Sequence, residues 1–362
     1  MGKRLRNVAK LFAAFCIIFA TPLVFAAQSL SPIWSIEFSP DGKTLAVGRY
    51  QWVELWDLET QRIIRTYEPH AGEIRSLKFS SQSVSDPERQ QATPLRLYAS
   101  GGIPSQSGEI RIWDVDSEEL INSFEIHGDT IESITLSPSS TTLLTASMDE
   151  YSAVLDLMML GDATVPIDEQ ATWLTQHVGR VLCTLYHPEG TYFVTGSEDK
   201  TIKVWHPDTF NVLVSLDASD DAVYSLAYSA AEGVIVSGSA DNTVRTWRVT
   251  PAGDGEGQDT LKMTGRLVRE YNGHQKDVYS VDCAMVSRRG SNPVAVIASG
   301  SADTSVIIWN LRSGNRYRTF DEPTDAVYAV KFSPNGEFVA AGGRDGKLRL
   351  WNLHKRTLTH EF

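Results

Sequence analysis

The chain has 362 residues, of which 33 are basic and 45 are acidic, and its formal net charge at pH 7 is −12. This acidic balance argues against a broad basic face of the kind that binds nucleic acid. A partner with a cationic surface, or simple solubility, fits the charge better.

The first 27 residues have the order of charge and hydrophobicity that is typical of a signal peptide. Four basic residues between positions 3 and 10 precede the apolar stretch 11–20, and Pro22 separates this stretch from small residues at a possible cleavage site. We expect the mature chain to begin near Ala27 and to be exported, to the periplasm or the extracellular space. The alternative is an uncleaved membrane anchor, because the apolar segment is about as long as the shortest that spans a bilayer. The chain has no Asn-x-Ser/Thr sequence, which favours a bacterial envelope protein over a glycosylated secreted one.

From residue 29 onward, a segment of about forty residues repeats along the chain. The same interval of 42 residues separates positions 113 and 155, 205 and 247, and 309 and 351, and all of these except Leu155 are tryptophan. Within one copy, residues 178–218, alternating apolar runs are broken by turn residues, which predicts four short antiparallel strands. Sheets of this kind bury their faces by stacking radially around an axis. The repeat therefore predicts a propeller, with strands a to d of each blade running from the axis outward.

The copies end in similar sequences, which in chain order are VELWDL, IRIWDV, AVLDLM, IKVWHP, VRTWRV, VIIWNL and LRLWNL. The order GH, FSPDG, SGSxD and WD resembles the WD40 repeat family and covers nearly all of residues 29–362. The resemblance implies an all-β, seven-bladed propeller over 28–362, after the signal or anchor segment 1–27. The implied blades span approximately 29–69, 70–126, 127–176, 177–218, 219–273, 274–322 and 323–362.

The resemblance also implies a hydrogen-bonded set in each blade, made of a His before strand a, a Ser or Thr on strand b, an Asp in the b–c turn and a Trp on strand c. We expect this set to be structural, because a buried imidazole and indole N–H need partners. It is complete in blade 4 as His177, Thr195, Asp199 and Trp205, and in blade 6 as His274, Ser299, Asp303 and Trp309.

The other blades depart from this set. Blade 3 keeps His127, Thr145 and Asp149 but has Leu155 at the Trp position, and blade 2 keeps His70 but has Ser107 at the Asp position. The His position holds Ser219 in blade 5 and Pro323 in blade 7, and blade 7 also has Ala341 at the Ser position. Blade 1 has neither the His nor the Asp. We therefore expect blade 7 to lose less stability than blade 6 when the turn Asp is removed.

In this family the residue one step into strand a lines the top rim and often touches partners. Here the rim residues are Trp34, Arg75, Glu132, Leu182, Tyr224, Tyr279 and Tyr328. Four of them are aromatic and belong to blades 5, 6, 7 and 1, which are adjacent once the ring closes. Exposed Tyr and Trp are typical of interface hot spots, so the arc is a candidate partner site. The alternative is that these rings only pack beneath the rim.

Two further expectations concern connections and closure. Extra residues fall at 81–96, 157–172, 250–265 and 285–293, all in a–b or c–d connections on the face opposite the rim. The first strand of blade 1 begins at Ile33, so blade 7 must supply its own outer strand, Thr357 to Phe362, and no strand is shared at the closure.

No catalytic, metal-binding or cofactor motif is evident. The S-x-x-K match at residues 197–200 is a b–c turn, and the acidic segment 253–259 lacks the spacing of a calcium loop. Cys183 and Cys283 lie on strands of blades 4 and 6, too far apart for a disulfide. We expect an exported, non-enzymatic platform that binds protein. The alternatives are a periplasmic hydrolase or lyase with a site in the central channel, and an envelope assembly factor held by an uncleaved anchor.

Overall fold

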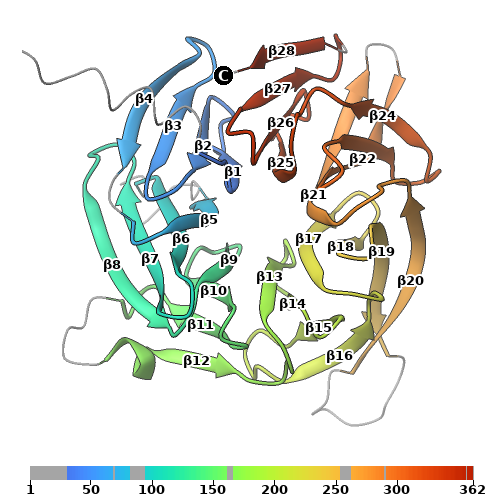
Figure 1. The fold of residues 1–362 in the computed structure, drawn as a ribbon. Coiled ribbons are helices and arrows are strands. Elements are labelled where there is room, and N and C mark those ends of the chain that lie inside the picture. The colour runs from blue at the N-terminus through green and yellow to red at the C-terminus, as the bar shows by residue number, and fades with distance from the viewer. Residues whose placement is uncertain are drawn as a thin grey trace, which may run out of the picture.

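Seven antiparallel sheets of four strands surround a central axis (Figure 1). The computed structural model describes residues 31–67, 70–81, 94–160, 166–252, 262–288, 291–355 and 357–361. Within these ranges the chain is all-β apart from one short 3-10 helix, η1 (Ile167–Gln170). The all-β, seven-bladed propeller predicted from the repeats is therefore confirmed, whereas the expected signal or anchor segment 1–27 lies outside the described residues.

Each blade contains four strands that are consecutive in the chain. The innermost strands are β1, β5, β9, β13, β17, β21 and β25 (Figure 1). Blade by blade, the strands are β1 (Ser35–Phe38), β2 (Thr44–Gly48), β3 (Val53–Asp57) and β4 (Arg62–Tyr67); β5 (Glu73–Phe79), β6 (Arg96–Ile103), β7 (Ser107–Asp114) and β8 (Leu120–His127); β9 (Ile131–Leu136), β10 (Thr142–Ser147), β11 (Ser152–Asp156) and β12 (Ala171–Leu174); β13 (Val181–Tyr186), β14 (Phe193–Ser197), β15 (Thr201–Trp205) and β16 (Val212–Asp217); β17 (Val223–Ser229), β18 (Val234–Ser239), β19 (Thr243–Pro251) and β20 (Met263–Asn272); β21 (Val278–Arg288), β22 (Ser291–Ser301), β23 (Val306–Asn310) and β24 (Arg316–Phe320); and β25 (Val327–Phe332), β26 (Phe338–Gly343), β27 (Arg349–Asn352) and β28 (Thr357–Glu361).

The second strand of a blade is among its most buried, because neighbouring blades cover both of its faces. Every residue of β14 and β18 is buried, and both strands consist of apolar and small residues. The outer strand β20, by contrast, is mostly exposed and polar. A strand that is covered on both faces has a continuous apolar run in its sequence and not an alternation of apolar and polar residues.

Five b–c turns share one backbone shape. The residue after the turn Asp has a φ between 70° and 76° at Glu150, Lys200, Asn242, Thr304 and Gly346. The Asp carboxylate stabilises this turn by accepting the backbone N–H two residues later, as Asp199 Oδ1 does from Thr201 at 2.9 Å. A short acidic side chain is suited to this role because it can reach its own backbone.

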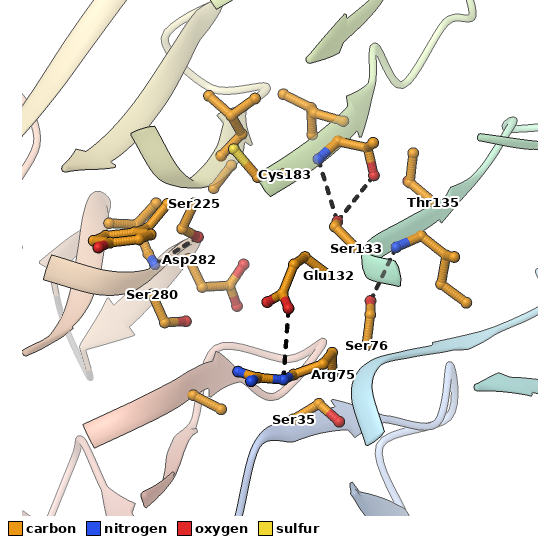
Figure 2. A pocket seen from close by; sticks show the side chains of 18 of the residues that line it. Ser35, Arg75, Ser76, Glu132, Ser133, Thr135, Cys183, Ser225, Ser280 and Asp282 are labelled. Atoms are coloured by element: carbon orange, nitrogen blue, oxygen red, sulfur yellow. Dashed lines mark hydrogen bonds and ion pairs between the residues drawn. The ribbon is translucent and has the colours of Figure 1, made fainter. Parts of the chain in front are cut away.

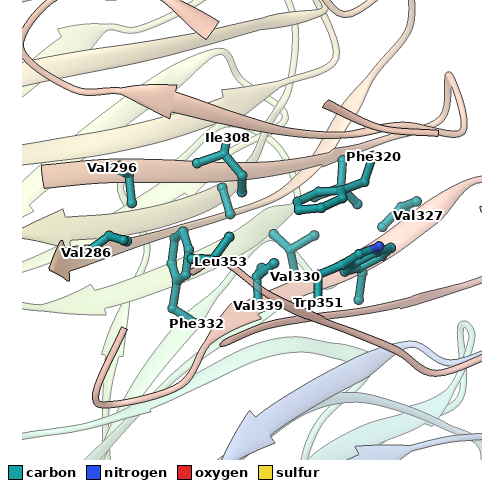
Figure 3. Packing of buried hydrophobic residues seen from close by; sticks show 13 residues of the cluster. Val286, Val296, Ile308, Phe320, Val327, Val330, Phe332, Val339, Trp351 and Leu353 are labelled. Atoms are coloured by element: carbon teal, nitrogen blue, oxygen red, sulfur yellow. The ribbon is translucent and has the colours of Figure 1, made fainter. Parts of the chain in front are cut away.

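The hydrophobic core lies between blades. Seven clusters of buried apolar residues occur in the described chain, and each joins two neighbouring sheets. Figure 3 shows the cluster between blades 6 and 7, where side chains of both sheets interdigitate: Val296, Ile308 and Phe320 from blade 6, and Val330, Phe332, Val339 and Trp351 from blade 7. A single sheet thus has no core of its own, and each blade depends on its neighbours.

The ring closes by packing between blades 7 and 1. Strand β28 pairs with β27, so blade 7 supplies its own outer strand, as predicted. The backbone N–H of Ile33 donates to Gly343 O at 2.9 Å, and Arg49 Nη1 donates to Gly346 O at 3.0 Å. Ile33 also packs with Leu348 and Leu350. Among the described strands, none is shared between these two sheets.

Two of the expected insertions extend strands. The hairpin β21–β22 continues to the pair Arg288 and Ser291, and β19–β20 continues to Pro251 and Met263. These two insertions lie in the expected a–b and c–d connections, and part of each is paired as strand. Residues 82–93, 161–165, 253–261 and 289–290 lie outside the described residues. The described ranges contain no helix with the length and apolar character needed to cross a membrane.

Candidate functional site

The seven innermost strands surround one cavity of about 640 Å³, which extends along the propeller axis. Equivalent positions of these strands form three levels. The first level, at the mouth, holds the rim residues Trp34, Arg75, Glu132, Leu182, Tyr224, Tyr279 and Tyr328; the second holds Ser35, Ser76, Ser133, Cys183, Ser225, Ser280 and Ala329; the third holds Glu37, Lys78, Thr135, Leu185, Ala227, Asp282 and Lys331.

A β-bulge positions most of the rim residues. In blades 2 to 7 the register of strand a against strand b shifts at the rim residue, as between Val223 and Ser225 on either side of Tyr224. Equivalent shifts occur in the other five of these blades. A bulge leaves one residue without a partner across the sheet and re-aims its side chain. The rim side chain and the next one can therefore both face the channel.

The four aromatic rim residues form one continuous series. The rings of Trp34 and Tyr328 are stacked, with centroids 4.6 Å apart and planes 6° apart. The Tyr328 and Tyr279 centroids are 5.5 Å apart, and those of Tyr279 and Tyr224 are 5.2 Å apart. All four side chains are half-buried. The structure thus brings together the arc expected from the sequence, and its rings contact one another while remaining partly accessible.

Arg75 and Glu132 occupy the rim beside this arc. The Arg75 guanidinium lies over the Trp34 ring at 4.2 Å and contacts Glu73 at 2.6 Å. Arg75 Nε lies 3.6 Å from Glu132 Oε1, and Figure 2 shows the Glu132 carboxylate projecting into the cavity. Burial raises the pKa of Glu132, although Arg75 opposes the effect.

The second level links neighbouring blades through serine hydroxyls. Ser76 Oγ accepts the backbone N–H of Ile134 in the next blade at 3.2 Å. The same contact recurs from Ser133 to Thr184 N at 3.2 Å, from Ser225 to Val281 N at 3.0 Å and from Ser280 to Val330 N at 3.1 Å. Figure 2 shows several of these serines around the cavity. The sequence analysis missed this role, although the serine directly after the rim residue recurs in five copies.

The third level contains a chain of four alternating charges on consecutive blades. Asp282 Oδ1 lies 3.6 Å from Lys331 Nζ, which lies 3.4 Å from Glu37 Oε2, and Lys78 Nζ lies 3.1 Å from the same oxygen. Burial alone would raise the pKa of Glu37, but Lys331 and Lys78 outweigh it and hold this pKa below its usual value. Burial lowers the pKa of Lys78, whereas Asp282 and Glu37 outweigh burial at Lys331 and raise its pKa. The sequence analysis did not identify this cluster.

The hydrogen-bonded sets of blades 4 and 6 have all their members in contact. His177 lies 2.7 Å from both Asp199 and Thr195, and Trp205 Nε1 donates to Thr195 Oγ1 at 2.8 Å. In blade 6, His274 lies 2.9 Å from Asp303 and 2.7 Å from Ser299, which accepts from Trp309 Nε1 at 2.8 Å. Burial opposes ionisation of both aspartates, but the His and hydroxyl contacts hold their pKa values well below the usual range.

Comparison with known proteins agrees with this geometry. The family model "WD domain, G-beta repeat" matches residues 23–57, 118–151, 168–206, 210–248, 265–310 and 314–352, which together are more than half of the chain. The chain belongs to the WD40 repeat family. It is similar to the guanine nucleotide-binding protein subunit beta of Oryza sativa subsp. indica, at 22% identity over 80% of this chain and 70% of the relative. The subunit from Zea mays is 23% identical over the same shares. Striatin-3 of Bos taurus is 26% identical over 65% of this chain, which corresponds to 36% of striatin-3.

Blade 2, which the family model does not match at residues 70–113, takes the carboxylate of its WD40 set from another position. Glu109 Oε2 lies 2.9 Å from His70 Nδ1 and accepts the Ala71 N–H at 2.9 Å, the contacts that Asp199 makes in blade 4. Assigning Ser107 to the Asp position was wrong, because the carboxylate comes from strand β7 and its longer side chain reaches back to the turn. His70, Ala71 and Arg111 outweigh the effect of burial and hold the pKa of Glu109 at about 2.

In the WD40 blades that lack the His, a buried arginine contacts the carboxylate. Arg245 lies 2.6 Å from Asp241 in blade 5, and Arg349 lies 2.8 Å from Asp345 in blade 7. Each arginine stands on strand c, two residues before the Trp. Blade 1 pairs Arg49 with Glu54 at 2.9 Å. These arginines compensate for the missing histidines, and the sequence analysis did not assign them this role.

Blade 3 of this WD40 chain lacks the strand-c Trp but keeps the rest of the set. His127 lies 2.8 Å from Asp149 and 2.7 Å from Thr145. The indole of Trp173, on the outer strand β12, packs edge-on against His127 with centroids 5.2 Å apart. An aromatic side chain from strand d thus packs against the histidine of the blade that has Leu155 at the Trp position.

Nucleophiles and metal ligands are not assembled into a site within the described ranges. No group of three or more His, Cys, Asp or Glu side chains there could hold a metal ion. Ser197, at the end of β14, donates to the carbonyl of Arg180, just before β13, at 2.8 Å. Cys183 and Cys283 are free, and burial raises the pKa of both thiols.

Proposed function

We propose that this WD40 protein is a non-enzymatic platform that binds a protein partner at the channel mouth. The observation that carries the proposal is the aromatic series Trp34, Tyr328, Tyr279 and Tyr224, half-buried and in ring contact around one side of the mouth. Such rings lose little conformational entropy on binding because they already hold one another in place, and Tyr and Trp dominate binding hot spots. The plant relatives are named as subunits, that is, as members of assemblies.

A propeller enzyme with a channel site is the second candidate, because the third level places two carboxylates in a ligand-sized cavity. Lys331 lies between Glu37 and Asp282, and each carboxylate is paired with it. Asp282 also accepts the backbone N–H of Phe332 at 2.8 Å. These contacts leave neither Glu37 nor Asp282 free to act as a base. The arrangement supports a structural role for the cluster and favours the platform.

We also propose that the platform is exported, on the charge and hydrophobicity order of residues 1–27. Cleavage near Ala27 would release it into the periplasm or the extracellular space. If the segment is retained as an anchor, the same platform becomes a membrane-held envelope assembly factor. No nucleic-acid partner is proposed, given the net charge of −12.

If the rim is the binding surface of the platform, the double variant Tyr279→Ala/Tyr328→Ala should lose binding of the partner. Tagged mature protein captures the partner from its own cell envelope, and the purified pair is then measured by titration calorimetry. We expect binding to weaken by about 2 kcal/mol or more, because two hot-spot rings are removed. Circular dichroism and a urea melt establish that the variant is folded.

The matched control removes exposed apolar side chains from the opposite face. Met158 and Met159 are 76% and 63% exposed in a c–d turn of blade 3, and Met158→Ala/Met159→Ala should bind the partner as the wild type does. If instead the control variant loses the partner and the rim variant retains it, the partner binds the opposite face, and the aromatic arc has only a packing role.

A further inference from the structure

The tyrosine side of the channel mouth carries carboxylates without basic partners. Asp221 and Asp277 form no ion pair within the described residues, and Glu198 makes only an exposed contact of 3.9 Å with Arg180. Burial and the charges of Asp277, Asp221 and Glu198 raise the pKa of Tyr224 to about 12. The largest charges that act on Tyr224 are thus negative. The mouth beside Tyr224 is therefore acidic, and Arg344, which acts on the neighbouring Tyr279, is paired with Asp325 at 3.8 Å.

Glu132 adds a carboxylate on another side of the mouth. It belongs to blade 3, which lies across the ring from blades 6 and 7 (Figure 1). Its Oε1 is buried and makes no hydrogen bond in the described chain, and the nearby Arg75 Nε makes none either. The Arg75 charge is instead held by Glu73 at 2.6 Å. Glu132 thus lines the cavity with a carboxylate whose ion pair with Arg75 is long, at 3.6 Å (Figure 2).

The aromatic arc already binds one cation of the chain. The Arg75 guanidinium lies 4.2 Å from the centroid of the Trp34 ring, at one end of the series. The faces of aromatic rings attract cations, and more strongly where water is partly excluded. The rings of Tyr279 and Tyr224, at the other end of the series, have no such cation within the described residues.

We propose that the channel mouth takes a protruding lysine or arginine side chain of the partner, with its cation between Glu132 and the arc of Tyr224, Tyr279 and Tyr328. The inference rests on the platform function and specifies the chemistry of its partner. The cavity of about 640 Å³ beneath the mouth has room for an extended side chain. The net charge of −12 attracts a basic segment over a longer range.

The test uses three short glycine-flanked peptides with blocked termini and a fluorescent label, which differ only in a central arginine, lysine or citrulline. Citrulline has the shape of arginine without its charge. Fluorescence anisotropy should show that the arginine and lysine peptides bind wild-type protein at least tenfold more tightly than the citrulline peptide. Glu132→Gln and Asp277→Asn should each weaken binding of the arginine peptide about tenfold, since each removes one carboxylate. Glu189→Gln, the same change in an exposed a–b turn on the opposite face, should have no effect.

Equal binding of the arginine and citrulline peptides, no binding of any peptide, or full binding by both carboxylate variants would overturn the inference. The partner measurement separates this failure from that of the platform. If Tyr279→Ala/Tyr328→Ala loses the captured partner while Glu132→Gln and Asp277→Asn keep it, the rim binds a partner without a cation. If the double tyrosine variant keeps the partner, the rim is not the binding surface.

Discussion

At the scale of single residues, the propeller depends on whether each buried indole N–H finds an acceptor. Trp205, Trp247 and Trp309 donate to Thr195, Ser237 and Ser299 at 2.8, 3.0 and 2.8 Å. Trp351 is fully buried in blade 7, and its Nε1 has no acceptor in the described chain because Ala341 stands at the serine position. An unsatisfied buried donor costs stability.

Ala341→Ser should therefore stabilise the protein by about 1 kcal/mol, the net value of a buried hydrogen bond. The new hydroxyl would accept from Trp351 and donate to the carbonyl of Arg349, since residues 341 and 349 are paired as 299 and 307 are in blade 6. Urea unfolding measures the change. Ser237→Ala, the reverse substitution in blade 5, is the control and should destabilise; a neutral or destabilising Ala341→Ser would show that the indole is satisfied in another way.

At the scale of the element, blades 2 to 7 each use one carboxylate from the b–c turn or from strand c, but the partner of that carboxylate differs between blades. Histidine fills this role in blades 2, 3, 4 and 6, and arginine from strand c fills it in blades 5 and 7. The arginine is a permanent charge, and Arg349 is 2% exposed. The sequence analysis expected removal of the turn Asp to destabilise blade 7 less than blade 6, but it did not take Arg349 into account. The buried ion pair of Arg349 with Asp345 does not support that expectation.

Asp345→Ala should cost at least as much as Asp303→Ala. Removing the Asp303 carboxylate leaves His274 and the backbone N–H groups of the turn without their acceptor, which should lower the free energy of unfolding by about 1–3 kcal/mol. Removing Asp345 leaves the buried Arg349 with Glu361 alone at 3.0 Å, and breaking a buried charge pair costs about 3 kcal/mol or more. Urea melts of the two variants decide the order. A smaller shift for Asp345→Ala would mean that Glu361 by itself compensates Arg349.

At the scale of the whole molecule, stability is shared around the ring because every core cluster joins two blades. The junction between blades 7 and 1 has the same kind of core, and no described segment of the chain passes across it, so the closure rests on this cluster and on the hydrogen bonds from Ile33 to Gly343 and from Arg49 to Gly346. Any N-terminal processing must leave Ile33 in place for the ring to close.

Export predicts that the protein isolated from its native host lacks the first 26 or 27 residues. The reason is the basic and apolar order that precedes the proposed cleavage site. Intact mass spectrometry of the soluble and membrane fractions is the measurement. A full-length mass in the soluble cytoplasm would refute export, and a full-length mass in the membrane fraction would indicate the anchored form.

The sequence by itself determined the repeat, and with it the propeller, because a four-stranded unit with an interval of 42 residues between Trp positions has few other ways to bury its faces. It also located the Ser or Thr and the Asp of the complete sets in blades 4 and 6, which lie at constant offsets from the Trp, and the family resemblance located the rim residues, which in blades 2 to 7 lie five positions after the His position. A pattern of this kind is local in the chain, so it can be recognised from the sequence alone.

Only the tertiary structure decided which side chains meet across blades. The alternating charges of Asp282, Lys331, Glu37 and Lys78 come from the two ends of the chain and become neighbours when the ring closes. Glu109 replaces the turn aspartate from a strand, a substitution at no constant offset. Both features depend on distances set by the curvature of the ring and the twist of each sheet. A sequence pattern records spacing along one chain, and it does not contain those distances.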